Sequence, residues 1–158
     1  MKRIKLSLIT LLLVIPIIFS SCKKDDDPIA ENAKVTASID GVEWNGITTQ
    51  ASNSTMNVLN ISGVSESGAA ISITIVNGLE EGTYILNKTS FSVGTYTEGS
   101  EGYTTNGSSD VGGEVIITEV NYTDKTISGT FSFDVYGLST HNIKSITNGV
   151  INKVTFTN

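Results

Sequence analysis

The chain has 158 residues, and its 10 Lys and Arg against 16 Asp and Glu give it a formal net charge of −6. This acidic balance argues against nucleic acid and against an anionic membrane surface as electrostatic partners. The single Cys excludes an internal disulfide framework, so the fold must be held by backbone pairing and a buried core.

Residues 1–21 have the pattern of a bacterial export signal. Lys2, Arg3 and Lys5 form a positive start, and the stretch 6–19 that follows is largely apolar. It is shorter than the ~20 apolar residues that a transmembrane helix needs. We therefore predict a signal peptide over 1–21, whose removal leaves 7 basic and 16 acidic residues, a net charge of −9.

Cys22 is the only Cys, and it directly follows two small residues, Ser20 and Ser21. A lone Cys in an exported protein forms an intermolecular disulfide, stays free or is modified. The arrangement resembles the lipobox of bacterial lipoproteins. This resemblance implies that the Cys22 thiol is acylated, that the chain is cut before it, and that the lipid attaches the protein to a membrane. An ordinary secreted protein is the alternative.

A short charged cluster follows Cys22 after one intervening residue, Lys23. This cluster resembles the surface-export signal of lipoproteins from the Bacteroidota phylum, and it consists of Lys24, Asp25, Asp26 and Asp27. The resemblance implies an outer-membrane lipoprotein exposed at the cell surface, with the periplasmic face as the alternative. Residues 22–33 are polar and do not alternate, so we expect a lipidated Cys and a flexible tether ahead of one domain over 34–158.

The composition from Cys22 onward is that of β-structure, because Val, Ile and Thr make up 45 of 137 residues. Residues 34–39 alternate between apolar and polar, Asp40-Gly41 is a strong hairpin signal, and 42–49 is the predicted return strand. Trp44, the only Trp, is interpreted as a core plug near one end of the sheet rather than as a ligand-stacking residue.

The rest of the chain continues as short strands between turn signals. Gly129 lies in an apolar row, which indicates a bulge or close packing against a large neighbour. Asn148-Gly149 is interpreted as a late turn, and 98–113, rich in Gly, Ser and Thr, as a long exposed loop. The remaining predicted strands are 56–63, 69–76, 83–86, 91–97, 114–122, 126–135, 143–146 and 150–156.

These elements predict an all-β fold, an antiparallel β-sandwich or β-barrel of about eight to ten strands. Three stretches, 35–44, 81–84 and 127–133 with 146–149, resemble a group of small Bacteroidota outer-membrane lipoproteins classed as a domain of unknown function. That resemblance implies an all-β surface lipoprotein and supplies no catalytic residues.

Candidate ligand-binding residues gather around the predicted loop 98–113. Tyrosines at a sheet rim can stack on sugars or pack against proteins, and acids beside them can hydrogen-bond a ligand. The possible ligand-binding residues are Tyr96, Glu98, Glu101, Tyr103 and Asp110. The same acids, with Glu114, are the only basis for a carboxylate-based hydrolase, since their convergence cannot be judged from spacing.

Other chemistry has little support in the sequence. His141, the only His, lies outside any nucleophile motif, and one His with one Cys is too few for a transition-metal site. We therefore expect no enzyme activity, no catalytic residue, no metal and no cofactor. The favoured function is a surface protein that binds a glycan, a peptide or an envelope partner, and the alternative is a purely structural envelope protein.

Overall fold

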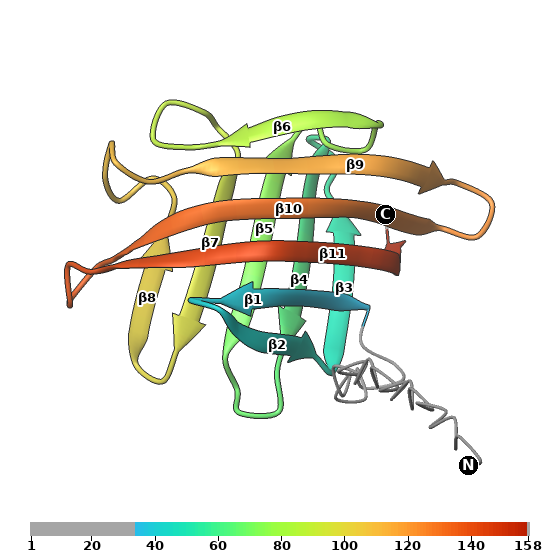
Figure 1. The fold of residues 1–158 in the computed structure, drawn as a ribbon. Coiled ribbons are helices and arrows are strands. Elements are labelled where there is room, and N and C mark those ends of the chain that lie inside the picture. Colours follow the sequence, from blue (N-terminus) through green and yellow to red (C-terminus); the bar gives the residue numbers. More distant parts are fainter. Residues whose placement is uncertain (1–33, 158) are drawn as a thin grey trace, which may run out of the picture.

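The computed structural model describes residues 34–157, and these form eleven β-strands and no helix (Figure 1). The predicted all-β class is therefore confirmed. Cys22, the cluster Lys24 to Asp27, the predicted signal peptide 1–21 and the tether 22–33 lie outside the described residues. The strands are β1 (Val35–Ile39), β2 (Val42–Gly46), β3 (Thr48–Asn53), β4 (Val58–Val64), β5 (Ala70–Val76), β6 (Gly82–Leu86), β7 (Val93–Glu98), β8 (Glu101–Thr104), β9 (Gly113–Asn121), β10 (Thr126–Gly137) and β11 (Ile143–Thr157).

The strands form two layers that face each other. One layer has the order β2-β1-β11-β10-β9-β6, and the other has the order β3-β4-β5-β7-β8. The strands of the first layer run across those of the second (Figure 1). We call them the front layer and the back layer, as they appear in that view.

The two layers are joined at two corners. The end of β11 pairs in parallel with β3, where Phe156 is opposite Ala51, and the end of β10 pairs with β8, where Tyr136 is opposite Thr104. Together with the β10–β11 pairing, these contacts close a ring of strands around the core. The structure thus has the two layers of a sandwich and the joined corners of a barrel, the two arrangements that the sequence predicts.

The core lies between the layers and follows from the alternation along each strand. In β5, Ile71, Ile73 and Ile75 are at most 1% exposed, while Ser72 and Thr74 between them face outward. Each buried Ile of this kind contributes ~1.5–3 kcal/mol relative to an exposed one. The buried apolar side chains from Val35 to Phe156 form one cluster.

The β1–β2 hairpin has the turn that its sequence predicts. Asp40 and Gly41 both have positive φ, 51° and 85°, and Ile39 pairs with Val42. The return strand, however, is not the single strand 42–49. It ends at Gly46, and the chain crosses to the back layer to form β3. Gly46 is closely packed, because a Cβ there would lie 3.1 Å from the Trp44 ring and from the Val35 carbonyl oxygen.

The predicted turn at Asn148-Gly149 is wrong. β11 runs unbroken from Ile143 to Thr157, and Asn148, with φ 52°, is the extra residue of a bulge. The register against β1 and β10 shifts by one residue at this point. Asn is tolerant of left-handed backbone, so the same dipeptide serves a bulge in a long strand as readily as a hairpin turn.

At Gly129 the prediction of a bulge is confirmed, and the alternative of close packing against a large neighbour is wrong. The pairing of β10 shifts register next to Gly129 against both neighbouring strands. The extra residue lies in β9 in one pairing and in β11 in the other. The atoms that a Cβ at Gly129 would meet are backbone atoms of Ile116 and Ile117 in β9, not a large side chain.

The prediction that 98–113 is one long exposed loop is wrong in its first part. Gly99 and Ser100 form a tight turn, and Glu101–Thr104 is strand β8, which pairs with β7 and β10. Only the stretch 105–112 connects strands as a loop. The strand was missed because its four residues carry one apolar side chain, Tyr103, too few to show alternation.

Candidate ligand-binding site

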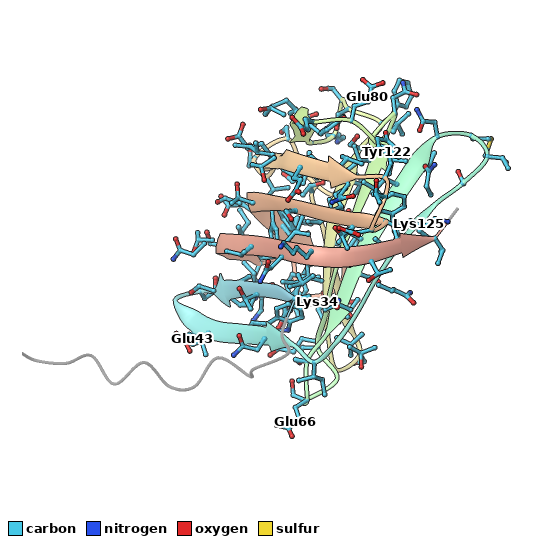
Figure 2. The ribbon with its side chains drawn as sticks, turned by 90° about the vertical axis from the view of Figure 1, so that its right-hand side faces the viewer. Lys34, Glu43, Glu66, Glu80, Tyr122 and Lys125 are labelled. Carbon is cyan, nitrogen blue, oxygen red and sulfur yellow. The ribbon has the colours of Figure 1, made fainter. Side chains whose placement is uncertain are left out.

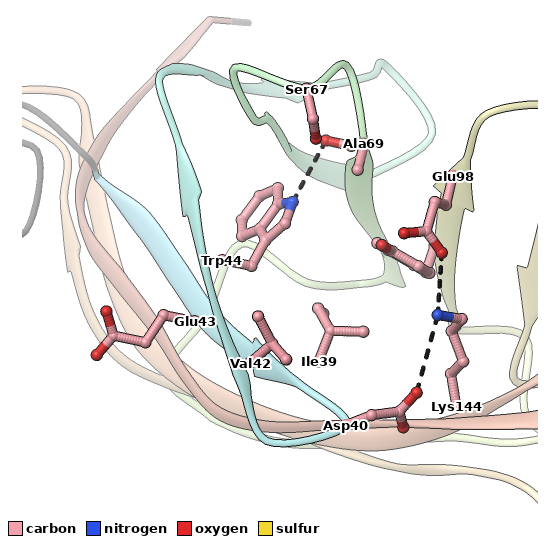
Figure 3. Close-up of a pocket in the computed structure, with 10 residues that line it drawn as sticks. Ile39, Asp40, Val42, Glu43, Trp44, Ser67, Ala69, Glu98 and Lys144 are labelled. Carbon is pink, nitrogen blue, oxygen red and sulfur yellow. Dashed lines mark hydrogen bonds and ion pairs between the residues drawn. The ribbon is translucent and has the colours of Figure 1, made fainter.

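A pocket of about 350 Å³ opens where one end of the β1–β2 hairpin meets the back layer (Figure 3). Four separate segments line it: the β1–β2 hairpin, the β4–β5 turn, β7 and the start of β11. Its lining residues are Ile39, Asp40, Val42, Glu43, Trp44, Ser67, Ala69, Tyr96, Glu98 and Lys144.

Trp44 forms the inner wall of the pocket and ties the hairpin to the back layer. Its side chain is 6% exposed, and its indole Nε1 donates a hydrogen bond to the carbonyl oxygen of Ala69 at 3.3 Å. The ring lies over Gly63, where an added Cβ would come within 2.9 Å of it. The interpretation of Trp44 as a core plug near a sheet end is thus confirmed.

Lys144 carries the positive charge of the pocket. Its Nζ lies 2.9 Å from Oε2 of Glu98 and 3.8 Å from Oδ2 of Asp40 (Figure 3). It also lies 5.7 Å and 5.6 Å from the ring centroids of Tyr96 and Tyr103, a cation–π arrangement. The hydrogen bond to Glu98 raises the pKa of the Lys144 ammonium, and the charge of Glu98 adds to this effect while partial burial opposes it.

The pocket is acidic despite this lysine. Asp40 and Glu98 supply two carboxylates against one ammonium, and the third acid of the lining, Glu43, points away from Lys144 (Figure 3). Asp40 is held in place because its Oδ1 accepts a hydrogen bond from the backbone N–H of Ser145 at 2.8 Å. The side chains of Asp40 and Glu98 are 50% and 54% exposed, so both remain accessible to a ligand.

Tyr96 and Tyr103 are not the exposed rim residues that the sequence predicts. They are 3% and 5% exposed, and their rings pack against each other with centroids 5.7 Å apart. Burial raises the pKa of the Tyr96 hydroxyl, with a further contribution from the charge of Glu98. Because β7 and β8 form a hairpin, both side chains point inward from the same cross-strand pair.

The three predicted acids have separate places. Glu98 lines the pocket, and Asp110 lies in the loop 105–112, where its oxygens and backbone interact with neighbouring Ser side chains. Glu101, although paired with Glu98 across the β7–β8 turn, instead binds the β10–β11 connection. Its Oε1 accepts hydrogen bonds from the backbone N–H groups of Ser139 and Thr140 at 2.8 and 3.1 Å.

The hydrogen bonds of Glu101 predict that the structure around Ser139 and Thr140 depends on pH. The hydrogen bonds from Ser139 and then Thr140 lower the pKa of Glu101 from its ordinary value of 4.5. A lowered pKa in the folded state gives stability that is present above the ordinary value and is lost as the pH falls through the lowered one. We expect the amide signals of Ser139 and Thr140 to titrate below pH 4.5 in NMR spectra, and their hydrogen exchange to rise relative to other amides there.

The matched variant Glu101→Gln should remove this titration and leave the other amide titrations in place. Glu119→Gln, which removes a carboxylate bonded only to a side-chain hydroxyl, should leave the Ser139 and Thr140 signals unchanged. Titration of both amides at or above pH 4.5 would contradict the assignment.

Sequence reasoning missed Asp40, Glu43 and Lys144 as parts of one site. Asp40 and Ser145, which hydrogen-bond, are 105 positions apart, and the β1–β11 pairing brings them together. The hairpin signal at Asp40-Gly41 placed this acid at a turn but did not show which strand would lie beside it.

His141 stacks on Tyr136, with ring centroids 5.9 Å apart. Within 34–157, no group of three or more His, Cys, Asp or Glu side chains is placed to hold a metal ion. Over the same residues there is also no helix with the length and apolar character needed to cross a membrane.

Fold and pocket together define an all-β protein of two crossed layers, with a charged pocket at one end of its β1–β2 hairpin. The chain belongs to the DUF6252 family, a domain of unknown function, whose family model matches residues 31–155. Neither a curated protein nor a solved structure gives a significant match. The predicted membership of a domain-of-unknown-function family is therefore confirmed.

Proposed function

We propose that this protein is a lipid-anchored, non-enzymatic binding protein of a Bacteroidota outer membrane, displayed at the cell surface, and that its pocket holds a basic side chain of a peptide or envelope protein. The anchor and its location rest on the resemblance of Ser20-Ser21-Cys22 to a lipobox and of the acidic cluster after it to an export signal. The observation that carries the binding role is the net negative pocket with an apolar wall.

The pocket chemistry favours a basic side chain over a sugar. Sugar binding commonly uses an exposed aromatic face, and the rings of Trp44 and Tyr96 are almost fully covered. The groups that a ligand can reach in the pocket are carboxylates and the side chain of Val42, which is 70% exposed. A lysine or arginine can lay its aliphatic stem along Val42 and Ile39 and direct its charge toward Glu98 and Asp40 (Figure 3).

The position of the pocket is compatible with the anchor. β1 begins at Val35, next to the predicted tether, and ends at Ile39 on the pocket rim (Figure 1). Four residue steps in a strand span ~13 Å. The pocket thus lies at the end of β1 that is away from the tether, which favours access from outside the membrane.

The arrangement of acids also supports a binding role over hydrolysis. A glycosidase-type mechanism needs two carboxylates facing one reacting bond. Glu98 is directed to Lys144, and Glu101 is directed to Ser139 and Thr140. Glu114 lies on β9 opposite Ile85 and Ser132, in the front layer.

The binding role predicts charge-dependent capture of a basic peptide. An acetylated and amidated pentapeptide with a central Lys should perturb the fluorescence of Trp44, with an affinity that weakens as salt rises. Because an exposed ion pair contributes ~0.2–1 kcal/mol, Glu98→Gln should raise the Kd by up to about fivefold.

Asp110→Asn is the matched control, because it removes the same charge from a loop outside the pocket. It should leave the Kd within error, and a peptide with norleucine in place of Lys should bind far more weakly. Equal effects of Asp110→Asn and Glu98→Gln, or equal binding of the two peptides, would contradict the proposal that this pocket binds a basic side chain.

A further inference from the structure

The outer face of the back layer is free of charge, which is unusual for an acidic chain. In the strands β3, β4, β5, β7 and β8 the only charged residues are Glu98 and Glu101, and both lie at the β7–β8 turn. The nearby charged residues Glu66 and Glu80 lie beyond the strand ends, at the bottom and the top of the side view (Figure 2). The strands of the front layer, in contrast, carry Glu43, Glu114, Glu119, Asp134, Lys144 and Lys153.

Short hydroxyl, amide and β-branched side chains cover this face. One cross-strand row consists of Gln50, Ser62, Ser72, Thr95 and Thr104. The next row consists of Ser52, Asn60, Thr74 and Val93. Exposed positions commonly carry Lys, Glu, Asp and Arg as well as Ser, Thr, Asn and Gln, and this face has only the second group. It shares the depletion of charge with the cores of protein interfaces, although those cores are also depleted in Ser.

Polar groups at the centre of the face are already paired with one another. The Asn60 side-chain amide donates hydrogen bonds to Thr74 Oγ1 at 2.9 Å and to Ser72 Oγ at 3.2 Å. The Thr95 hydroxyl donates to the Ser72 carbonyl oxygen at 3.4 Å. Removing water from this face therefore costs less than removing it from unpaired polar groups.

We propose that this face is an interface between two copies of this chain, which pack their back layers against each other about a twofold axis. The net charge of −6, which becomes −9 if the predicted signal peptide is removed, makes two copies repel each other, and this face is where the repulsion is smallest. A twofold axis brings the same patch of both copies together, which suits a flat face of small uncharged side chains.

Other occupants fit this face less well. Its outward positions carry no aromatic side chain in the five strands, so a glycan has no ring on which to stack. It also has no cationic group for an anionic polymer or lipid headgroup. A second copy needs neither of these features.

The size of the face predicts a weak, reversible dimer. The five strands contain 30 residues. At ~4.8 Å spacing and ~3.3 Å rise they cover ~475 Å² per copy, so two copies bury roughly 950 Å², at the lower limit for a specific interface. We expect a Kd on the order of 10–100 µM for the dimer. A high local concentration of the protein would favour the dimer.

The test uses residues 22–158 with Cys22→Ser, so that a disulfide cannot link two copies. This segment contains all eleven strands and the whole core cluster. Sedimentation equilibrium from 10 µM to about 1 mM should show a mass rising from one copy to two. Over the same range, concentration-dependent amide shifts should be confined to the back layer.

Ser62→Lys places a charge at the centre of the face and should keep the chain monomeric throughout this range. Thr130→Lys places the same charge on an exposed position of β10 in the front layer and should leave the dimer intact. Circular dichroism and the emission of Trp44 verify that both variants fold. A monomer at 1 mM in the unsubstituted chain, shifts centred on the front layer, or a dimer lost in Thr130→Lys but kept in Ser62→Lys would each overturn the proposal.

Discussion

Replacing Gly129 with Ala is expected to destabilise the fold by roughly 2–3 kcal/mol, because the added methyl group has no room to move into. A Cβ at this position would overlap the carbonyl oxygen of Ile116 and would lie 3.2 Å from the Cα of Ile117. Both are backbone atoms of β9 in hydrogen-bonded register with β10, so neither can rotate away as a side chain can. The whole β9–β10 pairing must shift to accept the methyl group.

Gly102→Ala is the matched control for this prediction. Gly102 also lies in a strand, and the nearest atom to its added Cβ is the flexible Cδ1 of Leu138, at an ordinary 3.7 Å. Urea unfolding of both variants, followed by the emission of Trp44, should show a lower midpoint for Gly129→Ala only. A slight gain for Gly102→Ala of ~0.4–1 kcal/mol is expected, because Ala restricts the unfolded chain. Equal midpoints would show that β9 yields easily at Gly129.

Replacing Cys22 with Ser is expected to abolish lipid attachment completely, because Cys22 is the only thiol in the chain. Cells that express the protein with labelled palmitate should incorporate the label into the unsubstituted chain and none into Cys22→Ser. Stable attachment takes more than one acyl chain, so the labelled protein should stay in the membrane fraction in high salt. Label in Cys22→Ser, or no label in either protein, would contradict the proposed anchor.

The acidic cluster after Cys22 allows the proposed surface display to be tested separately from the proposed anchoring. Asp25, Asp26 and Asp27 replaced together by Asn should keep the palmitate label, since Cys22 is untouched. The proposed export signal would be lost, so protease added to intact cells should no longer digest the protein. Ser21→Ala keeps a small residue beside Cys22 and should leave both label and digestion unchanged. Continued digestion of the Asn variant would show that surface display does not depend on this cluster.

Local patterns were enough to predict most of the strands. Ile71, Ile73 and Ile75 alternate with small polar residues, and this period of two determines which face is buried whatever the neighbouring strands are. The Asp40-Gly41 turn was predictable for a similar reason, because two successive left-handed residues in a two-residue loop need that kind of dipeptide. The bulge at Gly129 was inferred from a missing side chain in an apolar row.

Where a stretch of sequence suits two different local structures, the sequence alone could not decide between them. Asn148-Gly149 supports a left-handed residue in either a turn or a bulge, and only pairing with β1 and β10 on both sides decided for the bulge. The stretch 101–104 looked like part of a loop because β8 is held by its pairing with β7 and β10 and not by its own composition.

The sequence by itself determined the all-β class, the buried face of most strands and the role of Trp44 as a core residue, because each depends on neighbours within a few positions. Only the tertiary structure decided that Tyr96 and Tyr103 are buried, that Glu101 binds a distant turn, and that Asp40, Glu98 and Lys144 meet at one pocket. These contacts join segments up to 105 positions apart, and which of them form depends on the order in which strands pair across two layers. Strand order is set by the packing of the whole core, so it leaves no signal in any one stretch of the chain.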